Sequence, residues 1–199
     1  MAETAAPRLS GEKFRDPRLT LSGEKRAVVP FSGLKTLWIN TGTLCNITCR
    51  NCYIDSSPSN DALAYITLAE TTAFFDEIAH DHLPTTEIGF TGGEPFMNPD
   101  IIPMIEAALT RGFAVLVLTN AMKPLANHRA AISDFAKRFG SQLTLRVSLD
   151  HYSAKSHDLE RATGRFAPTL ENLSSLARRA LTLHIAWPTC WDEDEHALR

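Results

Sequence analysis

Hydrophobic residues along the chain occur in short stretches separated by longer segments of mixed polarity. Phe113–Leu118 is continuously apolar, which is typical of a parallel strand buried on both faces. Leu143–Leu149 instead alternates apolar and polar residues, which is typical of a strand with one buried face. By these patterns, strands are expected at Leu37–Asn40, Glu87–Thr91, Phe113–Leu118, Leu143–Leu149 and Leu181–Trp187.

The segments between these strands carry apolar residues at helical spacing. Thr67 and Glu70 form a candidate capping box near the start of the first of them. Gly112 and Gly140 are placed to end two others. Helices are expected at Leu63–His80, Pro99–Arg111, His128–Phe139 and Pro168–Ala180, with a further helical start at Asp192–Arg199. Strict strand–helix alternation predicts a parallel α/β sheet, and the pattern alone fits a barrel or a doubly wound sheet.

The first part of the chain differs from the rest. Residues 1–33 are rich in Ala, Pro, Arg, Ser, Gly and Lys and show neither strand nor helix periodicity. Such a segment buries too little apolar surface to order itself. We therefore predict a mobile N-terminal leader at residues 1–33 and one main domain at residues 34–199.

Composition narrows the classes of partner. The 199 residues are 44% hydrophobic with a net charge of -3, so no basic nucleic-acid footprint is visible. No apolar run reaches membrane-spanning length, and no secretory signal begins the chain. A cytoplasmic protein without membrane or nucleic-acid partners is the expectation.

Three cysteines, Cys45, Cys49 and Cys52, lie within eight residues in the spacing C-x3-C-x2-C, and Cys190 is the only other cysteine. Three close thiolates on a polar loop can hold a soft metal or an iron–sulfur cluster, with one metal position left open. A zinc site completed by a histidine or by Cys190 is the alternative.

The cysteine spacing, followed by Gly92-Gly93-Glu94-Pro95 after an expected strand, resembles the radical S-adenosylmethionine (SAM) enzymes. The resemblance implies a [4Fe–4S] cluster on Cys45, Cys49 and Cys52, whose open iron is chelated by the amino and carboxylate groups of SAM. It also implies an incomplete (β/α)6 barrel, a partial TIM-type barrel of parallel strands. The sequence shows five of its six strands, as if truncated after the fifth.

The resemblance also implies which residues bind SAM. Gly92, Gly93, Glu94 and Pro95 would bind the amino group of its methionine part, and Arg161 would pair with its carboxylate. Ser148 and Asp150 share one face of a strand and would bind the ribose. Asn120 ends a strand in a Thr-Asn-Ala sequence where relatives have Thr-Asn-Gly. Tyr53 follows the third cysteine, whereas relatives place an aromatic residue just before it to contact the adenine.

The implied reaction begins with one electron from a flavodoxin- or ferredoxin-type donor. Reductive cleavage of SAM then yields methionine and a 5′-deoxyadenosyl radical that abstracts a hydrogen atom from a small-molecule or peptide substrate. Two other classes stay open on the sequence. One is a zinc-stabilised α/β binding module, and the other is a catalytically inactive radical SAM-like fragment.

Overall fold

The computed structural model describes residues 16–179 and 181–187, so Cys190 and the helix expected at Asp192–Arg199 lie outside the described residues. The chain divides into two compact units between Ser32 and Gly33. In the first unit, an antiparallel bridge joins Leu19 to Lys25. The mobility predicted for residues 1–33 stays a prediction.

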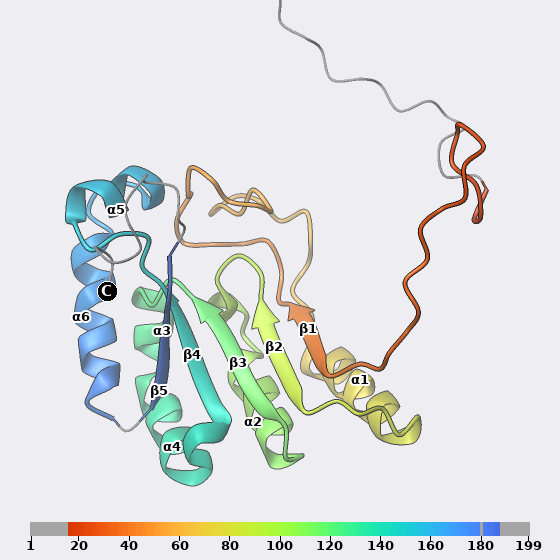
Figure 1. Cartoon of the computed structure of the whole chain (residues 1–199). Helices are drawn as coiled ribbons and strands as arrows, with labels where there is room; N and C mark the ends of the chain where they lie inside the picture. The colour runs from red at the N-terminus through yellow and green to blue at the C-terminus, as the bar shows by residue number, and fades with distance from the viewer. Residues whose placement is uncertain (1–15, 180, 188–199) are drawn as a thin grey trace, which may run out of the picture. The chain divides into compact units, whose positions relative to one another are not determined.

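In the described part of the second unit, five parallel strands pair in chain order (Figure 1). They are β1 (Thr36–Asn40), β2 (Glu87–Thr91), β3 (Ala114–Thr119), β4 (Leu143–Ser148) and β5 (Thr182–Ala186). A doubly wound sheet reverses its strand order near the middle, whereas a barrel adds each new strand beside the last. The observed order therefore confirms the predicted partial TIM-type barrel.

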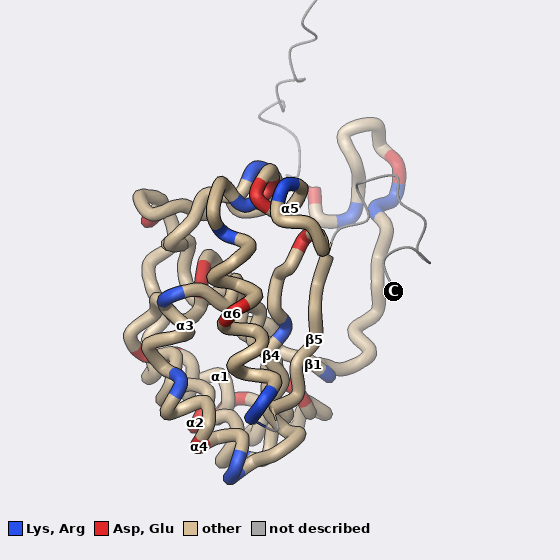
Figure 2. Tube along the Cα trace, turned by 90° about the vertical axis from the view of Figure 1, so that its left-hand side faces the viewer, with Lys and Arg blue, Asp and Glu red and all other residues tan. Residues whose placement is uncertain are grey.

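The helices are α1 (Leu68–His80), α2 (Ile101–Thr110), α3 (Lys123–Asn127), α4 (Arg129–Phe139), α5 (Ala154–Arg161) and α6 (Phe166–Ala177), with 3-10 turns η1 (Pro95–Met97) and η2 (Gly140–Gln142). Most of them form a layer on one side of the strands, whereas α5 lies at the carboxyl end of the strands (Figure 2). The core forms between this layer and the helix-facing side of the strands; fully buried members include Phe75, Phe90, Ile88, Met104, Ile132, Leu145 and Leu176. Within the described ranges, no helix has the length and apolarity needed to cross a membrane.

The sequence pattern placed most elements correctly and missed two short helices. The predicted capping box is confirmed, because Thr67 and Glu70 exchange side-chain to backbone hydrogen bonds. α1 therefore begins at Leu68, and the expectation of a start at Leu63 was wrong. α3 and α5 were not expected, because α3 has only five residues and α5 is strongly polar. Their positions depend on contacts with the rest of the fold.

Asp158 fixes the turn between α5 and α6. Its carboxylate accepts hydrogen bonds from the backbone N–H groups of Gly164, Arg165 and Phe166, at 2.6, 3.0 and 2.8 Å. Partial burial acts to raise the pKa of Asp158, but these three donors outweigh it and hold the pKa below its usual value. The ionised side chain thus stabilises the start of α6.

Asp158→Ala is expected to lower the free energy of unfolding by about 2 kcal/mol at neutral pH, because three N–H groups lose a charged acceptor. The folded-state pKa lies below the unfolded one, so this stabilisation is present above the unfolded pKa and disappears as pH falls through the folded pKa. Urea unfolding at about pH 7 and about pH 3 measures both values. The control Asp76→Ala removes only a surface ion pair to Arg111 and should cost under about 1 kcal/mol. An equal cost of Asp158→Ala at both pH values would contradict the charge argument.

Candidate active site

A cavity of about 430 Å³ lies where the loops after β1, β2, β3 and β4 meet. In parallel barrels this carboxyl end of the strands is where function gathers. Ten of the twelve predicted site residues line the cavity: Tyr53, Gly92, Gly93, Asn120, Ser148, Asp150, Arg161 and the cysteines Cys45, Cys49 and Cys52. Glu94 and Pro95, the other two, are buried and do not line the cavity.

The cysteine loop is fastened at both ends by the segment that follows it. The backbone N–H of Cys45 donates to the carbonyl of Ser57 at 3.1 Å, and the N–H of Ser56 donates to the sulfur of Cys52 at 3.2 Å. Cys45 is buried, whereas Cys49 and Cys52 are partly exposed, and all three are free thiols. The loop therefore presents three sulfurs to one cavity.

Burial makes the Cys45 and Cys49 thiols hard to ionise in the protein without a metal. It raises the pKa of Cys45 to about 11. Burial also raises the pKa of Cys49, although the Arg161 guanidinium opposes the shift. Because metal ligation requires thiolates, a bound metal must displace these protons.

The donor set is three cysteine sulfurs at one open cavity, which would suit an iron–sulfur cluster. Among the described residues, no group of three Cys, His, Asp or Glu side chains is arranged to hold one metal ion. A tetrahedral zinc needs its ligands to converge on one atom. An iron–sulfur cluster instead takes each cysteine on a different iron, so its sulfurs stand further apart. The three thiols line an open cavity, and the zinc alternative is not favoured.

Gly92 and Gly93 let the loop after β2 press against the cysteine loop. A Cβ on Gly93 would lie 2.2 Å from the carbonyl oxygen of Leu44, and one on Gly92 would lie 2.7 Å from that of Gly42. Gly92 also has a φ of +137°, which side chains rarely adopt. The N–H groups of Gly93 and Glu94 donate to the carbonyls of Gly42 and Leu44 at 2.8 and 3.1 Å. The two glycines thus position the residue directly before Cys45.

Glu94 binds neighbouring protein groups. It is 1% exposed, and its carboxylate accepts from the N–H of Phe96, the hydroxyl of Thr119 and the N–H of Asn120. Burial raises the pKa of Glu94 to about 7, with the three donors opposing the shift. These contacts tie the loop after β2 to the end of β3, and Pro95 begins η1 beside them. Binding of the SAM amino group by this carboxylate stays a prediction.

Asn120 connects the end of β3 to the cysteine loop. Its side-chain amide donates to the sulfur of Cys45 at 3.7 Å and to the side-chain oxygen of Asn46 at 2.9 Å. Its side-chain oxygen accepts from the N–H of Met122. The next residue, Ala121, has a φ of +54°, a conformation that glycine adopts more easily. The backbone conformation of Ala121 thus explains why the Thr-Asn-Gly sequence noted above has glycine at this position.

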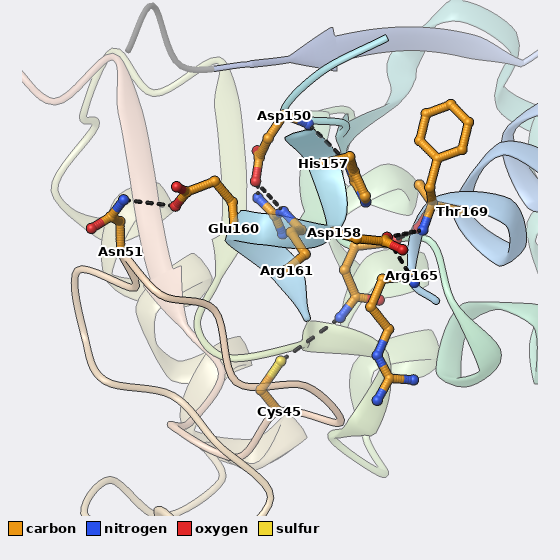
Figure 3. A network of polar contacts seen from close by, with 11 residues as sticks. Cys45, Asn51, Asp150, His157, Asp158, Glu160, Arg161, Arg165 and Thr169 are labelled. Atoms are coloured by element: carbon orange, nitrogen blue, oxygen red, sulfur yellow. Dashed lines mark hydrogen bonds and ion pairs between the residues drawn. The ribbon is translucent and has the colours of Figure 1, made fainter. Parts of the chain in front are cut away.

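Asp150 and Arg161 form a two-pronged ion pair at the cavity wall (Figure 3). The guanidinium donates from Nε and Nη2 to the two carboxylate oxygens at 2.7 and 3.0 Å. Burial acts to lower the pKa of Arg161, but its hydrogen bonds to Asp150 raise it, so the cation is kept. A charged pair next to Ser148 can recognise a zwitterionic ligand through both signs of charge.

The sequence reasoning missed the contacts between the cysteine loop and α5. Asn51 donates to the carboxylate of Glu160 at 2.6 Å (Figure 3). The backbone N–H of Arg50 donates to the Glu160 carbonyl. Glu160 also lines the cavity, as does Asn51. No local pattern marks residues so far apart in the chain as partners.

Tyr53 is 76% exposed, and its hydroxyl lies 3.1 Å from that of Thr91.

Comparison with known proteins agrees with this geometry. The family model described as "Radical SAM superfamily" matches residues 39–187. The antilisterial bacteriocin subtilosin biosynthesis protein AlbA of Bacillus subtilis (strain 168) is 27% identical over 143 residues, which are 71% of this chain and 30% of AlbA.

Among solved structures, Streptococcus suis SuiB bound to S-adenosylmethionine superposes with a TM-score of 0.65 at 14% identity, covering 82% of this chain and 35% of SuiB. SuiB bound to its precursor peptide SuiA gives 0.64 at 15% identity, covering 82% and 34%. The chain thus spans about a third of the length of these proteins.

Proposed function

The chain belongs to the radical SAM superfamily, and from this premise we propose that it holds a [4Fe–4S] cluster and cleaves SAM reductively. Cys45, Cys49 and Cys52 would hold the cluster. When bound and reduced, cluster and SAM together supply methionine and a 5′-deoxyadenosyl radical that abstracts a substrate hydrogen atom. The observation that carries the proposal is that three free thiols and the Asp150–Arg161 pair line one cavity.

The protein's own residues would bind and orient SAM. The Arg161 guanidinium suits a carboxylate, and Asp150 suits hydroxyl or ammonium donors. Ser148 lies two residues before Asp150 and lines the same cavity, so we assign both to the ribose. Asn120, whose amide reaches the Cys45 sulfur, would hold the cysteine loop in place. Glu94 would do the same, because its N–H donates to the Leu44 carbonyl and its carboxylate accepts from Thr119 of β3. Gly92 and Gly93 offer bare backbone to the methionine part, and Tyr53 is assigned to the adenine.

The experiment is anaerobic reconstitution with iron and sulfide, followed by dithionite reduction and assay of 5′-deoxyadenosine from SAM. We expect about four irons per chain and deoxyadenosine formation. A full cluster without SAM cleavage would favour a catalytically inactive relative. Bound zinc without a cluster would overturn the proposal and restore the binding module.

Arg161→Lys is expected to weaken SAM binding to the reconstituted protein about tenfold, because lysine keeps the charge but loses the two-pronged geometry. Equilibrium binding of SAM by anaerobic calorimetry measures the change. The control Arg138→Lys alters an exposed cation paired with Glu106 and Asp134, and SAM affinity should not change. An unchanged SAM affinity in Arg161→Lys would limit the pair to a structural role.

The substrate is proposed to be a peptide or a small molecule. SuiB is a structural neighbour bound to a precursor peptide, and AlbA is named for bacteriocin biosynthesis. A flavodoxin- or ferredoxin-type protein would supply the electron. A reducing cytoplasm suits this chemistry, because the three site cysteines are free thiols.

A further inference from the structure

Ser56 is a buried residue whose hydroxyl has no partner in the described protein. Its side chain lines the cavity that also holds the three cysteines. The residue is 3% exposed, and its Oγ atom makes no hydrogen bond. An unsatisfied buried hydroxyl destabilises the folded protein, so such groups normally have a partner.

The backbone around Ser56 already serves the cysteine loop. Its N–H donates to the sulfur of Cys52 at 3.2 Å. The next residue, Ser57, pairs with Leu44 in a parallel bridge and accepts from the N–H of Cys45. The segment is therefore fixed at both ends of the cysteine motif, and its hydroxyl is held at the same cavity.

We propose that the Ser56 hydroxyl donates a hydrogen bond to sulfur of the bound [4Fe–4S] cluster and thereby raises its reduction potential. The inference rests on the proposed function. Sulfur at the cluster is the acceptor favoured by position, because the N–H of the same residue already reaches Cys52 sulfur. Reduction adds negative charge to the cluster, and a hydrogen-bond donor stabilises that charge. Ser56 would be a positioning and tuning residue for electron entry.

Ser56→Ala is expected to move the cluster midpoint potential to a more negative value. We expect about a tenfold change in the reduction equilibrium, which is about 59 mV for a one-electron couple. The midpoint potential is measured by anaerobic redox titration, in which the EPR signal of the reduced cluster is monitored. Only protein molecules that contain a cluster contribute to this signal. Ser56→Thr keeps the hydroxyl and should restore the potential. Ser59→Ala is the matched control, because the Ser59 side chain is exposed, contacts the Ser57 hydroxyl and does not line the cavity, and it should leave the potential unchanged.

A second readout uses the wild-type protein and does not depend on the variant folding. Electron–nuclear double resonance of the reduced cluster should show a strongly coupled proton that is replaced soon after transfer to D2O. A buried amide proton exchanges more slowly than a hydroxyl proton, so timed exchange separates Ser56 O–H from its N–H. The absence of a fast-exchanging coupled proton would overturn the proposal.

Failure of this inference is distinguishable from failure of the proposed function. A wild-type protein that holds no cluster would refute the proposed function itself. Suppose that the wild-type protein holds a full cluster and cleaves SAM, and that Ser56→Ala has the same midpoint potential as the wild type. This result would refute only the role of Ser56. Weaker SAM binding in Ser56→Ala with an unchanged potential would likewise refute it, because the hydroxyl would then face SAM.

Discussion

Replacement of Cys49 by alanine is expected to remove the iron–sulfur cluster and reduce deoxyadenosine formation to background. The reason is that the loop offers three thiols, and a cluster with an open iron needs all three. Iron and sulfide per chain, counted after anaerobic reconstitution, should fall from about four to under about one. Deoxyadenosine from SAM under dithionite gives the activity.

The matched control for this prediction is Cys190→Ala, which removes the only other cysteine in the chain. It should keep the iron content and the activity. Cys49 is only partly buried, so Cys49→Ala should keep the fold, as circular dichroism and thermal unfolding can verify. Full iron content in Cys49→Ala would exclude the assigned ligand set. Loss of iron in Cys190→Ala would add a ligand to it.

Gly93→Ala is expected to displace the cysteine loop, destabilise the protein and lower cluster content to under about half. Its φ lies outside the left-handed region, so alanine fits the backbone conformation. The problem is space: the new Cβ would lie 2.2 Å from the Leu44 oxygen, 2.6 Å from its carbonyl carbon and 2.8 Å from the Thr43 oxygen. Backbone atoms cannot rotate away. Overpacking of this kind costs about 1–3 kcal/mol or more, measured here as the change in unfolding free energy.

The control for Gly93→Ala is Gly140→Ala, at the end of α4. Gly140 has a φ of +55°, so alanine is strained there, but nothing lies within 4 Å of its Cβ position. We expect a cost of about 1–2 kcal/mol with cluster content unchanged. The comparison separates general instability from displacement of the cysteine loop. Native stability and full iron content in Gly93→Ala would show that the loops are not held by this contact.

The sequence determined the strand–helix order and predicted metal binding at the cysteine loop, because both depend on residues close in the chain. Periodicity predicted all five strands, and local capping at Thr67 and Glu70 was readable from four residues. Three cysteines within eight residues predict metal binding independently of the surrounding fold. Even so, the pattern left a barrel and a doubly wound sheet equally open.

Only the tertiary structure showed which distant segments contact the cysteine loop. Strand order chose the barrel, because pairing order is a property of the sheet and not of any one strand. The hydrogen bonds that Glu94 accepts from Thr119 and Asn120 join the loop after β2 to the end of β3. Glu160 reaches Asn51 across more than a hundred residues, and the lone hydroxyl of Ser56 is visible only once burial is known. Burial and hydrogen-bond satisfaction arise from packing, so no local pattern could have revealed them.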